Sequence, residues 1–75
     1  MRNKILYGAS RMLIAMELYR LGIVEESAVI CEAENMKNYF KLLLDEAQYS
    51  KDIKMIINIQ ETIDNYLYDM KGDMK

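Results

Sequence analysis

Apolar residues recur along this chain at alternating spacings of three and four positions, the period of an amphipathic helix. The pattern falls into three segments and predicts helices over about residues 3–21, 25–48 and 51–71. The expected core-facing positions are Ile5, Ala9, Met12, Met16 and Tyr19, then Val29, Ala33, Met36, Phe40, Leu43 and Ala47, then Ile53, Ile56, Gln60, Ile63, Leu67 and Met70. The sequence therefore predicts an all-α fold in one domain over residues 1–75, a three-helix bundle or a helical hairpin plus third helix with near-parallel packing.

The ends of these helices follow from a few local signals. Gly22 is expected to end the first helix in a Schellman motif, with Ile23 folding back onto Leu18. No Gly or Pro separates the second and third segments, but their apolar positions are one residue out of step, which predicts a turn with Ser50 as the N-cap. Asn35 is the expected place for any break in the second helix.

The first predicted helix has a second apolar stripe. At about 100° per residue this stripe lies almost opposite the core-facing positions, and it consists of Tyr7, Ile14, Leu18 and Leu21. A helix in a three-helix bundle needs only one apolar arc, so two opposed stripes predict that another chain covers the second. The alternative is that an irregular N-terminus or a broken second helix covers it.

The third helix also has more apolar surface than one neighbour can cover, because Ile57 widens one flank of its stripe while Met55, Ile59 and Tyr66 widen the other. Leaving four such side chains in water would forgo about 1.5–3 kcal/mol each. A core of this size supplies only ~3–5 kcal/mol of net stability. These values favour a homodimer built on the first and third helices. The expected interface residues are Tyr7, Ile14, Leu18, Leu21, Ile57, Ile59, Gln60 and Tyr66. Gln60 is either a register-setting polar residue within the seam or a rim residue that reaches solvent.

The composition excludes most catalytic and metal chemistry. The chain has no His and a single cysteine, Cys31, so an internal disulfide, a structural zinc site and a Ser-His or Cys-His pair are all ruled out within one chain. Carboxylate pairs such as Glu61 and Asp64 are typical of a solvated helix face. No cofactor, metal site or enzymatic activity is predicted.

Charge indicates the class of partner and the compartment. The formal net charge is -2, which disfavours nucleic acid as a partner. Arg11, Glu17 and Arg20 interrupt the N-terminal apolar run, so neither a signal peptide nor a membrane span is expected, and the cytoplasm is the expected location.

The sequence favours a non-enzymatic regulator, inhibitor or adaptor that binds itself and an unidentified protein, a type of small protein common in mobile genetic elements. One alternative is a DNA-associated helix-turn-helix regulator that uses a basic patch over residues 37–54, with aromatic side chains nearby. A second alternative is a small helical enzyme whose intersubunit site holds an anionic metabolite through Arg11 and Arg20.

Overall fold

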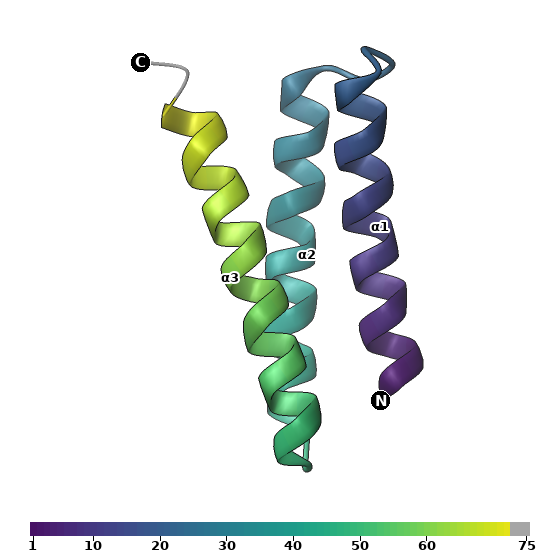
Figure 1. The fold of residues 1–75 in the computed structure, drawn as a ribbon, viewed down its shortest axis with the longest axis vertical. Coiled ribbons are helices and arrows are strands. Elements are labelled where there is room, and N and C mark those ends of the chain that lie inside the picture. The colour runs from purple at the N-terminus through teal and green to yellow at the C-terminus, as the bar shows by residue number, and fades with distance from the viewer. Residues whose placement is uncertain (73–75) are drawn as a thin grey trace.

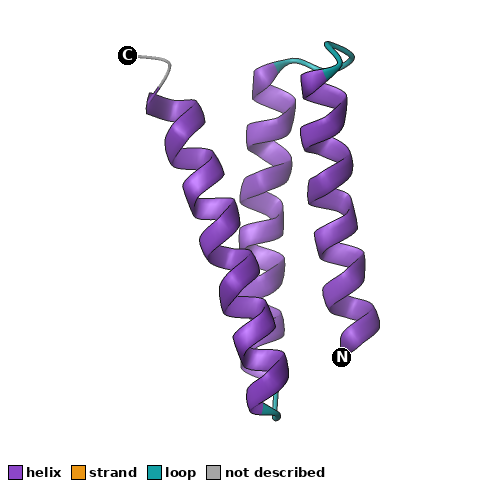
Figure 2. Ribbon diagram, viewed as in Figure 1, coloured by secondary structure: helices purple, strands orange, loops and turns teal. Residues whose placement is uncertain are grey.

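The computed structural model describes residues 1–72 and folds them into three helices joined by short turns (Figure 1). These are α1 (Arg2–Arg20), α2 (Glu26–Glu46) and α3 (Ser50–Gly72). No strand occurs within this range (Figure 2). The all-α three-helix bundle expected from the periodicity is confirmed. The last three residues of the expected domain, 73–75, lie outside the described part.

The helix ends differ from expectation by one or two residues. The α2 helix stops at Glu46 rather than residue 48 because the backbone of Ala47 is extended, with φ -70° and ψ 130°. Ser50 is the first residue of α3 rather than its cap, and the backbone N–H of Ile53 donates to the carbonyl of Tyr49 at 3.0 Å. The α2 helix runs unbroken through Asn35.

Gly22 ends α1 as expected. Its φ is +77°, in the left-handed region that glycine adopts without strain. The backbone N–H of Ile23 donates to the carbonyl of Leu18 at 2.9 Å, and that of Gly22 to the carbonyl of Tyr19 at 3.0 Å. These are the two hydrogen bonds of a Schellman motif. The backbone of Ile23 therefore turns back toward Leu18 as expected, but Ile23 stays 66% exposed.

The α2 helix is the centre of the bundle and packs against both of the others. The α3 helix packs mainly against α2, and toward its C-terminal end it leans away from α1 (Figure 1). The α1–α3 contact is therefore the weakest of the three. This asymmetry leaves the side of the bundle between α1 and α3 incompletely filled.

All buried apolar residues come from the core-facing positions that the periodicity predicts. They are Ile5, Met12, Val29, Ala33, Met36, Phe40, Leu43, Ile56, Ile63, Leu67 and Met70. The remaining predicted core positions are partly buried around this cluster. No buried residue within 1–72 is polar or charged.

Gly8 brings α1 and α2 close together. A Cβ at this position would lie 2.6 Å from Cζ of Phe40 and 2.8 Å from Cε1 of Tyr39. The ring of Phe40 is fully buried and occupies the space that the missing side chain leaves. The phenol of Tyr39 packs edge-on against Phe40, with ring centroids 5.3 Å apart. Gly8 is therefore part of the core, a role that the apolar pattern did not reveal.

Candidate protein-interaction surface

The outer side of α1 carries several exposed apolar side chains among its polar ones. Five large apolar side chains of α1 and its C-cap are more than half exposed, namely Leu6, Tyr7, Leu13, Ile14 and Leu21. The N-terminus is helical from Arg2 and α2 is continuous, so the alternative in which one of them covers the second stripe of α1 is wrong. The unusual feature of this surface is its concentration on one helix, since singly scattered apolar residues are normal on any protein.

One part of this surface borders α2. We call it the α1/α2 face and define it as the four predicted stripe residues of α1 together with Val24 and Ala28. Ile14 is 59% exposed, whereas Leu18 is partly buried. A shallow apolar groove of about 240 Å³ runs between Ile14 and Leu18 on one side and Ala28 on the other.

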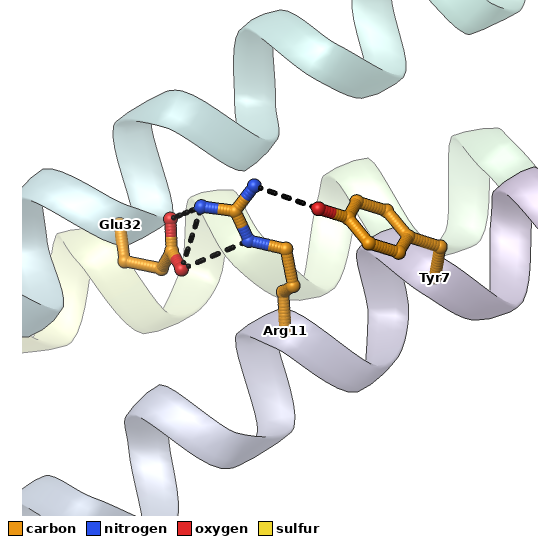
Figure 3. A network of polar contacts seen from close by, with 3 residues as sticks. All are labelled: Tyr7, Arg11 and Glu32. Carbon is orange, nitrogen blue, oxygen red and sulfur yellow. Dashed lines mark hydrogen bonds and ion pairs between the residues drawn. The ribbon is translucent and has the colours of Figure 1, made fainter.

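An ion pair between α1 and α2 lies at one end of the groove on the α1/α2 face, and Figure 3 shows its hydrogen bonds. The guanidinium of Arg11 donates to both carboxylate oxygens of Glu32, with Nη2 2.7 Å from Oε1 and Nε 3.1 Å from Oε2. Nη1 of Arg11 also donates to the hydroxyl of Tyr7 at 3.3 Å. The hydrogen bonds that Arg11 donates to Glu32, and then to Tyr7, raise the pKa of Arg11 above its ordinary value. Because Arg11 lies on α1 and Glu32 on α2, the pair also holds these helices in register.

A second part of the surface is the α1/α3 groove. This groove has a volume of about 280 Å³, and almost all of its lining atoms are apolar. The residues that line it are Ala9, Met12, Leu13 and Met16 of α1 and Asn58, Ile59, Thr62 and Ile63 of α3. A neighbouring hollow bounded by Leu13, Met16 and Tyr66 extends it toward the C-terminal end of α1. Burial, followed by the nearby Tyr19 and Glu26, raises the pKa of Tyr66. The groove exists because α3 leans away from α1.

The predicted interface residues do not form one continuous surface. Tyr7, Ile14, Leu18 and Leu21 lie on the α1/α2 face, whereas Ile59 and Tyr66 line the openings between α1 and α3. Ile57 is 39% exposed and lies about 160° around α3 from Ile59, on the opposite flank. Gln60, which is partly buried, lies on that same flank.

Leu6 and Leu13 belong to the exposed surface but were absent from the expected interface. Leu13 is 64% exposed and lines the α1/α3 groove. The two leucines are seven residues apart, two helical turns along one flank of α1. Both leucines lie between the two apolar stripes of α1, where a helix with only two apolar sides would be polar. Their seven-residue spacing on one flank could therefore have identified them.

The cysteine, lysine and arginine residues considered for other functions do not gather at one site. Cys31 is exposed, and Lys37 of the basic patch pairs with Asp64 at 3.1 Å. Arg11 and Arg20 are nine residues apart, on opposite sides of α1, and Arg20 pairs with Glu17 on its own helix. They do not converge on one pocket of the protomer. Residues 1–72 contain no cluster of three or more Cys, Asp or Glu side chains suited to a metal ion.

Comparison with known proteins finds no similar protein: no protein-family model, no curated protein and no solved structure matches the chain. Within the described range, none of the helices has both the length and the apolar character that crossing a membrane requires. The geometry of the exposed apolar surface is therefore the basis for any functional assignment.

Proposed function

We propose that this protein is a non-enzymatic regulator, inhibitor or adaptor that acts in the cytoplasm by binding other protein chains. In this proposal it self-associates as a homodimer through apolar helix faces, with small angles between the helix axes across the contact. It then offers a second apolar face to a larger protein. Nothing in the proposal requires a cofactor or a metal.

The observation that carries the proposal is the exposed apolar surface of α1. Its core-facing side is already covered by α2 and α3, yet five large apolar side chains on its outer side and at its C-cap remain more than half exposed. Burying the exposed part of each is worth about 1 kcal/mol. Together these contributions equal the ~3–5 kcal/mol of net stability that a domain of this size attains alone. Association is the means by which the chain can gain this energy.

The division of the surface supports two kinds of contact. The α1/α2 face and the α1/α3 groove flank the same helix on different sides, so a chain bound in one does not block the other. The Arg11–Glu32 pair gives the α1/α2 face a polar border, and such borders surround the apolar centres of many protein interfaces. One face can therefore serve the second copy while the other serves a different protein.

The test is a measurement of mass in solution on three charge-insertion variants. Leu13→Glu places a carboxylate in the α1/α3 groove, and Ala28→Glu places one on the α1/α2 face. Leu42→Glu is the matched control, since Leu42 is 69% exposed on α2 and lines neither opening. We expect the unmodified chain to be dimeric at micromolar concentration and one of the first two variants to be monomeric. Leu42→Glu should remain dimeric.

A chain that stays monomeric at high micromolar concentration would overturn the self-association part of the proposal. Binding to duplex DNA that weakens steeply with salt would instead favour the helix-turn-helix alternative.

A further inference from the structure

The α1/α3 groove and the side of α3 beside it show a pattern of charge and apolar residues that is complementary to itself. On this flank of α3, Lys54 lies at the N-terminal end and Asp69 at the C-terminal end, with Asn58, Glu61 and Asn65 between them. All five are exposed. Neither Lys54 nor Asp69 takes part in an ion pair among residues 1–72. The spacings of three and four residues along this set keep its members on one side of the helix.

An antiparallel pairing of two copies of α3 matches this pattern at its two ends, although it brings the exposed carboxylates of Glu61 from the two copies close to each other. If the two-fold axis passes between residues 61 and 62, Lys54 of each copy lies opposite Asp69 of the other. The same axis brings Asn58 level with Asn65, so that side-chain amides, each both donor and acceptor, meet across the contact. A parallel pairing of α3 with α3 would instead set Lys54 against Lys54 and Asp69 against Asp69.

The outer side of α1 has its own self-complementary register. An antiparallel pairing with the axis between residues 13 and 14 places Leu13 of both copies beside the axis. It brings Leu6 level with Leu21, so that apolar side chains meet apolar ones. Ser10 then lies opposite Glu17, and its hydroxyl can donate to that carboxylate.

The two registers coincide in the folded chain. The α1/α3 groove is lined by residues 9–16 of α1 and 58–63 of α3, and the midpoints of these ranges differ by 48 residues. The axis between 13 and 14 on α1 and the axis between 61 and 62 on α3 also differ by 48, so both lie at one height along the bundle. A single two-fold axis therefore satisfies the apolar match on α1 and the charge match on α3. This agreement between independent helices distinguishes the groove from a surface that is merely exposed.

We propose that the face formed by α1, α3 and the groove between them is the dimer interface, and that a second copy of the chain, packed face to face with its helices antiparallel, covers it. The four helices at the centre of the dimer are then α1 and α3 of each copy, and the two α2 helices lie outside. A symmetric contact of this kind uses the same patch on both subunits. The inference rests on the proposed self-association, and it leaves the groove between Ile14, Leu18 and Ala28 on the α1/α2 face for a different protein.

Cysteine cross-linking tests the register. In a Cys31→Ser background, Leu13→Cys should form an intermolecular disulfide rapidly, because position 13 lies beside the axis. Mixing Asn58→Cys with Asn65→Cys should give a covalent heterodimer faster than either variant alone gives a homodimer. Leu42→Cys, an exposed control outside the groove, should not cross-link. A parallel contact would reverse the second result, so faster homodimer formation by the asparagine variants would overturn the proposal.

A charge-swap cycle tests the pairing of Lys54 with Asp69 in the chain without introduced cysteines. Lys54→Asp and Asp69→Lys should each raise the dimer dissociation constant by about 3- to 10-fold, since every dimer has two exposed copies of the pair. The double variant should return it to within about 2-fold of the unmodified chain, and the single-variant effects should shrink at high salt. Additive weakening in the double variant would refute the pairing.

The mass measurement distinguishes a failure of self-association from a failure of this particular interface. A monomeric unmodified chain would defeat self-association and this interface together. A dimer that survives Leu13→Glu but dissociates in Ala28→Glu would keep self-association and refute the α1/α3 groove as its site.

Discussion

Replacing Gly8 with alanine is expected to destabilise the fold, although the same exchange usually stabilises a helix. In an unconstrained helix interior the added methyl would contribute about 1 kcal/mol. Here it would lie 2.6 Å and 2.8 Å from two ring atoms of Phe40 and 2.8 Å from a ring atom of Tyr39. Contacts this short cannot persist, so α1 must move away from α2 or the rings must turn.

The magnitude depends on how easily the rings can move. The ring of Tyr39 is partly exposed and can shift outward, at the expense of the 2.8 Å hydrogen bond from its hydroxyl to the carbonyl of Lys4. The ring of Phe40 is fully buried and cannot shift without disturbing the core. Overpacking of this kind costs about 1–3 kcal/mol. After the helix-propensity gain is subtracted, Gly8→Ala should lower the free energy of unfolding by about 1 kcal/mol, or roughly 4–8 °C in Tm.

Urea and thermal denaturation followed by circular dichroism measure this change, at one fixed protein concentration because dimerisation would add to the apparent stability. Gly72→Ala is the matched control, since no side chain of the described residues 1–72 lies within 4 Å of a Cβ at that position. Phe40→Leu removes the two ring atoms that the methyl would strike, so in that background Gly8→Ala should cost less or become favourable. A Gly8→Ala chain at least as stable as the unmodified one would refute the close-approach argument.

Two further changes address single positions on α1 and its C-terminal turn. Gly22→Ala should lower the free energy of unfolding by about 1 kcal/mol, because φ is +77° and the surrounding space is open, so the cost is in the backbone alone. Gly22→Asn should cost less, and equal urea midpoints for the alanine variant and the unmodified chain would contradict this. At Glu17, the hydrogen bond from Arg20 lowers the carboxyl pKa below its ordinary value of 4.5. The pair therefore stabilises α1 above the unfolded-state pKa, and its contribution is lost as the pH falls through the lowered folded-state pKa. An NMR titration of the Glu17 carboxyl carbon should show its pKa return to about 4.5 in Arg20→Gln; an unchanged pKa in that variant would be inconsistent with this cause.

The amino-acid sequence by itself determined the three helices and the side that each turns inward. Hydrophobic spacing fixes the rotation of a helix about its own axis, because burying any other side would expose the apolar stripe. That is why Phe40, Ile56 and the other fully buried residues all came from the predicted positions. Local backbone chemistry is equally readable, as Gly22 shows, since only a left-handed residue completes its turn.

The tertiary structure alone decided how the helices share their neighbours. Periodicity along one chain does not state which pair of helices packs closely and which pair separates. The sequence therefore grouped Ile14 and Ile59 into one interface, whereas the lean of α3 places them at different openings. Gly8 was missed for the same reason, and the spacing of Leu6 and Leu13 could mark Leu13 as an exposed apolar residue but not as part of a groove. The role of Gly8 is set by a ring 32 residues away that fills its empty side, and that of Leu13 by a gap between two helices that are not adjacent in the chain.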